Sequence, residues 1–211
     1  KKLTPDYPVG CRRILIADDF YPTLMRDNVD LITDGIAEIV PEGIRTKDGV
    51  LHEYDILVFA TGFETTGWHW SVDVVGQGGV TIEQAWADGP EAYLGITVAD
   101  FPNFFVLYGP NTNLGHNSIT FMLERQVEYT IKALDKLDEA GAVAMAPKRA
   151  VQDTFNKDLQ ARLGETVWAD PACNSWYKTE GGKITQNWSD HTRAYADAVA
   201  AVDLKHYDLV K

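Results

Sequence analysis

The chain has 211 residues, of which 45% are hydrophobic and 11% aromatic. This share of apolar side chains is sufficient for a packed core and argues against wholesale disorder. Its formal net charge of −12 argues against binding to nucleic acid or to an anionic membrane surface, because both need clustered lysine and arginine. No apolar run approaches the ~18 residues of a membrane-spanning helix, and the two cysteines suggest neither a disulfide framework nor a zinc pattern. These features predict a reduced, cytoplasmic protein of one or two domains.

The first quarter of the chain predicts an irregular connector followed by short elements. Proline and glycine punctuate residues 1–13, and a helical turn is expected at 20–24. Apolar residues then indicate strands near 29–32 and 36–40. A hairpin is expected around the Asp-Gly pair at 48–49, because this pair supplies the positive φ angles that a tight turn needs.

Residues 54–63, YDILVFATGF, are the segment around which we expect the sheet to be organised. The nearly unbroken apolar run is typical of a strand that is buried on both faces of a parallel sheet. The run ends at Ala60, Thr61 and Gly62, small residues that let a ligand or another backbone come close. Open α/β sheets bind ligands at this end of their strands. A core strand followed by an ordinary turn explains the same residues equally well.

The remaining chain is predicted to be mainly helical. From residue 118, apolar side chains recur at helical spacing through more than two heptads, which indicates a long helix at 118–140. The same spacing predicts a second helix at 149–163. The other expected segments are loops at 64–80 and 164–190, a short helix at 82–86 capped by Thr81, strands at 95–98 and 104–107, and a last amphipathic helix from about 189 to 202.

Five segments occur in the order and at the spacing of a known enzyme family. They are LTPDYPVGCRR at 3–13, MRDNVDLI at 25–32, DILVFATGF at 55–63, FPNFFVLYGPNTN at 101–113 and NSWY at 174–177. Together they resemble the carboxyl-terminal part of a Baeyer–Villiger-type, flavin-containing monooxygenase. The resemblance implies an α/β fragment of mixed α+β elements. This fragment would be part of a two-domain flavoprotein fold that binds FAD and NAD(P), with helices at its carboxyl terminus.

The resemblance also implies three parts. Residues 1–24 would end the NADP-binding domain and its linker, 25–141 would be the carboxyl-terminal portion of the FAD-binding domain, and 142–211 would be a helical and loop extension. No G-x-G-x-x-G fingerprint occurs in the chain, and it begins without an initiator Met. We therefore expect a fragment that is inactive alone and whose partner is the missing amino-terminal half. Exposed apolar strands in such a fragment also predict a homo-oligomer.

Arg12 and Arg13 are the first candidate site residues. Two adjacent guanidinium groups repel each other, and the planar donor fork of arginine suits phosphate, although two solvated surface arginines would look the same. The resemblance implies that Arg12 binds the 2′-phosphate of NADPH and that Arg13 is the catalytic arginine over FAD. The permanent charge of Arg13 would stabilise a C4a-peroxyflavin and the negative oxygen formed when that peroxide attacks a carbonyl.

The turn before the long helix is the second candidate site. A strand, a turn of small residues and a helix amino terminus together favour negative charge, although a routine strand-to-helix loop has the same composition. The resemblance implies that Asn111, Thr112 and Asn113 lie beside the isoalloxazine of FAD. It also implies substrate contacts for Leu114 and His116.

Further cofactor contacts are implied for four residues. Thr61 and Gly62 would let the cofactor or the inter-domain linker approach closely. Trp176 would lie near the nicotinamide end of NADP, where an aromatic plane with a donor is suitable, and Lys183 would contact a phosphate. The histidines show no metal-ligand spacing, so no metal site is expected.

The resemblance implies that the intact parent uses FAD, NADPH and O2 to insert one oxygen atom into a ketone, a small organic substrate. A close alternative is a flavin monooxygenase that oxidises sulfur or nitrogen centres or hydroxylates amines. An alternative of another class is a non-catalytic interaction module. Bound FAD in the purified chain would exclude that last alternative.

Overall fold

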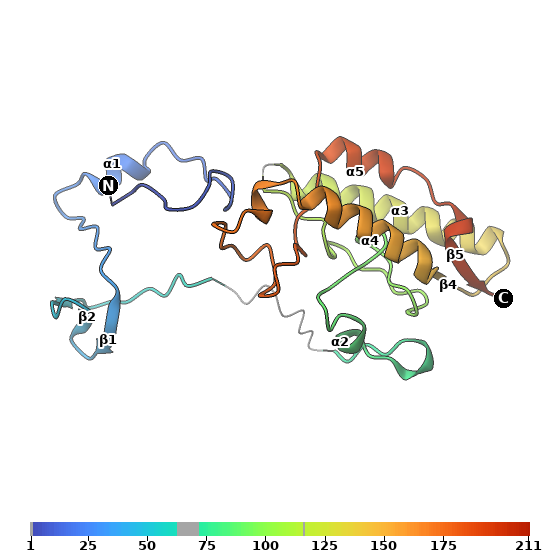
Figure 1. The fold of residues 1–211 in the computed structure, drawn as a ribbon, viewed down its shortest axis with the longest axis horizontal. Helices are drawn as coiled ribbons and strands as arrows, with labels where there is room; N and C mark the ends of the chain where they lie inside the picture. Colours follow the sequence, from blue (N-terminus) through green and yellow to red (C-terminus); the bar gives the residue numbers. More distant parts are fainter. Residues whose placement is uncertain (1, 63–71, 116) are drawn as a thin grey trace. The chain divides into compact units, whose positions relative to one another are not determined.

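A computed structural model describes residues 2–62, 72–115 and 117–211. The described chain has mixed α/β structure, as predicted (Figure 1). Its two small sheets are antiparallel rather than parallel. It divides into two units: Lys1–Pro5 with Leu15–Glu64 form unit 1, and Asp6–Ile14 with Thr65–Lys211 form unit 2. No helix in the described ranges is long and apolar enough to cross a membrane. The three-part division implied by the resemblance stays a prediction.

Unit 1 contains one helical turn and one meander. The helix α1 spans Phe20–Leu24, and the strands β1 (Ile36–Val40), β2 (Gly43–Thr46) and β3 (Leu51–Glu53) pair in that order. The predicted hairpin is confirmed. Gly49 has a φ of 89°, and the Asp48 carboxylate accepts hydrogen bonds from the Thr46 hydroxyl and the Val50 N–H. These two bonds hold the pKa of Asp48 below its usual value.

Two predicted strands of unit 1 do not form. Residues 29–32 and 54–62 belong to neither sheet, and Ile56, Val58 and Phe59 are 80%, 80% and 68% exposed. A strand buried on both faces needs hydrogen-bonding neighbours and side chains above and below it, and the described part of the chain supplies neither. Residue 63, the end of the predicted strand, lies outside the described ranges.

Unit 2 is mainly helical. The predicted helices at 82–86, 118–140 and 149–163 are confirmed, whereas the last helix is shorter than expected. The predicted strands at 95–98 and 104–107 are reduced to isolated bridges. The elements are the 3₁₀ turns η1 (Gln77–Gly79), η2 (Val167–Ala169) and η3 (Leu204–His206), the helices α2 (Ile82–Ala85), α3 (Ile119–Glu139), α4 (Arg149–Leu163) and α5 (Thr192–Ala198), and the strands β4 (Ala144–Pro147) and β5 (Tyr207–Val210), which pair with each other.

Local capping explains where these helices begin. The Thr81 hydroxyl accepts the N–H of Gln84, whose side chain accepts the N–H of Thr81, so α2 begins with a capping box. The Ser118 hydroxyl accepts the N–H of Phe121 at the start of α3. His191 caps α5 through its Nδ1, which accepts the N–H of Ala194 at 3.0 Å.

The core of unit 2 lies between α3, α4 and the carboxyl-terminal segments. Leu159 and Leu163 of α4 are completely buried, and burial of such a side chain contributes about 1.5–3 kcal/mol. Figure 1 shows α5 alongside α3, which it contacts. Tyr129 and Tyr207 share a buried hydroxyl–hydroxyl hydrogen bond of 2.6 Å, and the Tyr195 hydroxyl donates to the carbonyl of Leu94.

Unit 2 also contains a disulfide between Cys11 and Cys173, with a Cα–Cα distance of 5.4 Å. Both cysteines are completely buried. The expectation that the two cysteines make no disulfide framework is therefore wrong. The two residues are 162 positions apart, and the spacing of only two cysteines carries no information on a pair that the fold creates.

Candidate functional site

The segment that carries Arg12 and Arg13 is held in unit 2 by a disulfide and by hydrogen bonds. Cys11 is bonded to Cys173, and the Trp168 indole N–H donates to the carbonyl of Gly10 at 3.2 Å. The Arg12 guanidinium donates to the carbonyl of Asn174 at 3.3 Å and lies 4.6 Å from the centre of the Tyr7 ring. The paired arginines are thus held beside the NSWY segment.

Arg13 is held against the turn that precedes α3. Its Nη1 donates to the carbonyl of Leu114 at 2.9 Å. Two phenols, the buried Tyr177 and the more exposed Tyr108, lie within electrostatic reach of this guanidinium. Loss of solvation raises the pKa of both phenols, and the charge of Arg13 opposes that rise. Both phenols therefore stay neutral near neutral pH, and the positive charge of Arg13 is not cancelled by a phenolate.

The turn at 109–113 is held by its own side chains. The Thr112 hydroxyl donates to the carbonyl of Gly109 at 2.7 Å. The Asn111 amide donates to the carbonyls of Ile184 and Asn187, and the Asn113 amide donates to the side-chain oxygen of Asn187. Asn111, Thr112 and Asn113 are at most 4% exposed, so their side chains build the turn. Their predicted contact with FAD stays a prediction.

The backbone of this turn adopts a conformation that few residues favour. Tyr108 and Asn111 have φ angles of 59° and 58°, in the left-handed region. A Cβ atom at Gly109 would lie 2.3 Å from the carbonyl oxygen of Gly95, so only glycine fits there. Backbone strain of this kind is stored where the surrounding structure enforces it, often at functional sites.

A hollow of about 200 Å³ lies beside Arg12. It is lined by Gly10, Arg12, Ile14, Gly115, Val167 and Trp168. Ligand pockets for whole small molecules usually have about 300–1,000 Å³, so this hollow suits one group of a larger ligand. Trp176, the tryptophan of NSWY, is 43% exposed, and its ring centre lies 4.5 Å from that of Tyr177.

Three sequence motifs therefore meet in unit 2. GCRR, GPNTN with Leu114, and NSWY are far apart in the sequence and are joined by the contacts of Arg12, Arg13 and Cys11. Tyr108, Trp168 and Tyr177 were not among the predicted site residues. The available signal was their position, because Tyr108 directly precedes GPNTN and Tyr177 ends NSWY.

Lys183, another predicted site residue, is held by an ion pair elsewhere in unit 2. The Lys183 ammonium donates to the Glu91 carboxylate at 2.6 Å and to the carbonyls of Asp88 and Gly89, so a phosphate would have to displace an ion pair. Thr61 and Gly62 are exposed residues of unit 1, and His116 lies outside the described ranges. The cofactor and substrate roles of these residues stay predictions.

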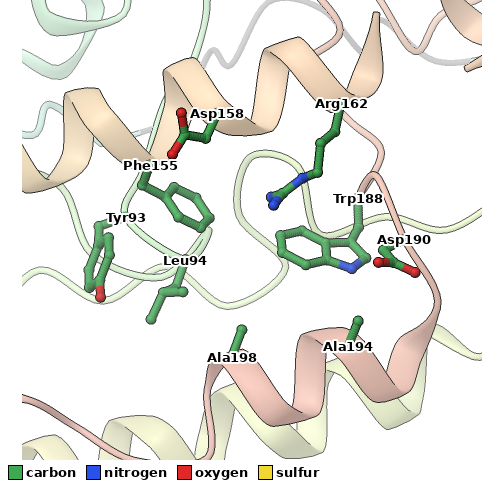
Figure 2. Close-up of a pocket in the computed structure, with 9 residues that line it drawn as sticks. All are labelled: Tyr93, Leu94, Phe155, Asp158, Arg162, Trp188, Asp190, Ala194 and Ala198. Atoms are coloured by element: carbon green, nitrogen blue, oxygen red, sulfur yellow. The ribbon is translucent and has the colours of Figure 1, made fainter. Parts of the chain in front are cut away.

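A second hollow, of about 300 Å³, lies between α4 and α5 (Figure 2). The Arg162 guanidinium lies 5.7 Å from the centre of the Trp188 ring and donates to the Ser189 hydroxyl. No predicted site residue lines this hollow. Its lining residues are Tyr93, Leu94, Phe155, Asp158, Arg162, Trp188, Asp190, Ala194 and Ala198.

Comparisons with known proteins agree with the motifs. No protein-family model matches the chain. It is 38% identical to a Baeyer–Villiger monooxygenase of Streptomyces coelicolor over 211 residues, which are 100% of this chain and 41% of that protein. It is 45% identical to the FAD-binding monooxygenase ktnD of Aspergillus niger over 204 residues, 95% of this chain and 33% of that protein. The chain is homologous to part of the Baeyer–Villiger-type monooxygenases.

Solved structures of this family share the fold of the chain. The cyclohexanone monooxygenase of Rhodococcus sp. Phi1 bound to NADP+ has a TM-score of 0.86 and 27% identity, over 100% of this chain and 41% of that one. OTEMO in complex with FAD and NADP has a TM-score of 0.80 and 29% identity, over 97% and 39%. The chain thus spans 33–41% of the length of these relatives and neighbours.

Proposed function

We propose that this chain supplies the two arginines of a Baeyer–Villiger-type monooxygenase. The whole enzyme would use FAD, NADPH and O2 to insert one oxygen atom into a ketone. The observation that carries the proposal is the meeting of GCRR with the turn before α3, where Arg13 is fixed at 2.9 Å from the carbonyl of Leu114. The homology to enzymes of this name supports it.

The exposed residues of the site fit the anionic and aromatic groups of NADPH. Arg12 and Arg13 are exposed, so an anionic group can reach both guanidinium groups from solvent. Arg12 lines a hollow large enough for one group of a dinucleotide, and its donor fork matches a phosphate. Trp176 offers an exposed aromatic surface for a nicotinamide ring.

Each residue then has a defined task. FAD, when bound, supplies the redox chemistry. Arg13 would stabilise negative charge that develops on the ketone oxygen of the bound substrate, because a guanidinium group carries a permanent positive charge. Its bond to the Leu114 carbonyl orients the charge before the reaction, so little reorganisation is needed. Arg12 binds the 2′-phosphate and thereby favours NADPH over NADH.

The exposed apolar segment of unit 1 indicates that this chain packs against another part of the whole enzyme. Ile56, Val58 and Phe59 would be costly to leave in water in a working enzyme. We propose that strands from the remainder of the protein cover this segment and complete the sheet. In their absence the same surface favours pairing between copies of this chain.

A chimaera tests the proposal. This chain replaces the matching segment of the Streptomyces coelicolor enzyme, and flavin absorbance, ketone-dependent NADPH oxidation and ester formation are measured. We expect bound FAD and an ester product. Arg13→Ala should lower kcat by about 10²–10³-fold with FAD content unchanged. Arg12→Ala should raise KM for NADPH and leave KM for NADH unchanged.

Arg149→Ala is the matched control, since Arg149 is an exposed arginine of α4 that pairs with Asp100 outside the motif cluster. Its kinetics should equal those of the unmodified chimaera. A flavin-loaded chimaera that is indifferent to Arg13→Ala would refute the catalytic role. A chimaera that oxidises a thioether but no ketone would favour the alternative in which the enzyme oxidises sulfur or nitrogen centres. A chimaera that binds no flavin would favour the alternative of a non-catalytic interaction module.

A further inference from the structure

The disulfide of unit 2 joins two of the motifs of the proposed site. Cys11 immediately precedes Arg12 and Arg13, and Cys173 immediately precedes the NSWY segment. The covalent link therefore fixes the arginine segment to the loop that carries Trp176. Nothing in the predicted function of either motif requires a cystine.

The hydrogen bonds that join the same segments are weak by comparison. The Arg12 bond to the Asn174 carbonyl has a length of 3.3 Å and is exposed to water. The Trp168 bond to the Gly10 carbonyl has a length of 3.2 Å. The exposed Arg12 bond competes with water, and the partly buried Trp168 bond joins Gly10 to η2 rather than to NSWY, so the cystine is the covalent restraint between the two segments.

The cystine belongs to the buried core cluster of unit 2, whereas most of its neighbours in sequence are exposed. Both cysteines are inaccessible, but Val9 is 87% exposed, and Arg12, Ala172 and Asn174 are exposed as well. Exposed loop segments open at a lower free energy than core helices, so an opening of these segments would uncover the sulfur atoms while α3 and α4 stay folded. A small thiol would reach the bond through such an opening, without global unfolding.

We propose that Cys11–Cys173 is a redox-controlled clamp that determines how firmly Arg12 and Arg13 are held. A low-molecular-weight disulfide oxidises the reduced pair. The Cys11 thiolate attacks it, forming a mixed disulfide and releasing one small thiol. The Cys173 thiolate then attacks the Cys11 sulfur, forming the protein disulfide and releasing the second small thiol. The cysteines lose two electrons and two protons, and an excess of small thiol reverses both steps.

Hydrogen exchange read by mass spectrometry tests the clamp. The chain is compared after oxidised and after reduced dithiothreitol, with the disulfide confirmed by intact mass. Reduction should accelerate exchange about tenfold or more in 8–14 and 172–177 and leave α3 and α4 unchanged. Cys11→Ser/Cys173→Ser should match the reduced chain and should not respond to dithiothreitol. Equal exchange in both redox states, or a native chain that never forms the bond, overturns the proposal.

The importance of the clamp for the site rests on the proposed function, so it has its own measurement. Adenosine 2′,5′-bisphosphate, a probe for the Arg12 phosphate site, should bind the oxidised chain about fivefold or more tightly than the reduced chain. By reciprocity it should slow reduction of the disulfide. Equal affinity of the probe for the oxidised and the reduced chain would show that the disulfide does not affect dinucleotide binding, and would overturn the link between the clamp and the Arg12 phosphate site. Absence of binding in both states counts against the phosphate role of Arg12, while hydrogen exchange still decides the clamp.

Discussion

Unit 1 and unit 2 bury their apolar side chains to very different degrees. Unit 2 has a continuous core in which Tyr129, Leu159 and Leu163 are at most 1% exposed. Among the described residues of unit 1, no hydrophobic side chain belongs to the buried core, and Ile16 and Val58 are 97% and 80% exposed. The arginine segment Asp6–Ile14 belongs to unit 2 although it precedes most of unit 1 in sequence. The candidate site is therefore built on the unit that has its own core.

The same substitution in each unit gives the largest expected contrast. Leu159→Ala leaves a cavity in the core and should lower the free energy of unfolding by about 2–5 kcal/mol, measured by urea denaturation. Leu15→Ala in unit 1, at a residue that is 82% exposed, should change it by less than about 0.5 kcal/mol. Similar costs for both variants would show that unit 1 has a core of its own.

Alkaline pH should weaken unit 2 through its buried tyrosines. Burial raises the pKa of Tyr93 to about 12 and raises the pKa values of Tyr129, Tyr195 and Tyr207. The folded state favours the neutral phenols over the phenolates. Their contribution to the free energy of unfolding is therefore fully present below pH 10, the usual pKa of tyrosine, and is lost as pH rises from 10 through the higher pKa values of the folded state. Urea denaturation from pH 8 to pH 11 measures the loss. Tyr129→Phe should reduce the slope, and a flat profile would contradict this account.

A capping substitution should give a smaller effect within unit 2. Ser118→Ala removes the hydroxyl that accepts the Phe121 N–H at the start of α3 and should cost about 1 kcal/mol. Ser118→Asp keeps an acceptor at that position and serves as the matched control. Thermal unfolding by circular dichroism measures both variants. An equal loss in the two variants would place the role of Ser118 outside capping.

The smallest stability effect is expected at the exposed segment of unit 1. Val58→Ser should change the free energy of unfolding by less than about 0.5 kcal/mol, because Val58 packs on little within this chain. The same change should weaken self-association, measured by light scattering, because it interrupts the exposed apolar run. A stability loss above 1 kcal/mol would mean that the segment is already packed.

Local signals were sufficient for much of the fold. The apolar spacing of α3 and α4, the cap at Thr81 and the turn at Gly49 each depend on a few neighbouring residues, and the structure confirms them. Residues 54–62 carry an equally clear strand pattern. They form no strand, because that pattern needs partners that the described chain does not provide.

Long-range pairing was beyond the sequence alone. The β4–β5 sheet, the Cys11–Cys173 bond and the Lys183–Glu91 ion pair each join residues sixty or more positions apart. The motifs of the site were identified from their resemblance to a family. The internal bonds of Asn111 and Asn113 were not predictable, because an amide next to a turn gives no sign of whether it faces a ligand or its own backbone.

The Cys11–Cys173 link also changes what a protease can do to this molecule. It closes residues 11–173 into a covalent ring that contains most of unit 1 and both long helices, α3 and α4. A single cut anywhere inside this ring leaves the two fragments attached to each other. The nicked protein should therefore keep its mass on a non-reducing gel and separate into two bands only after thiol treatment.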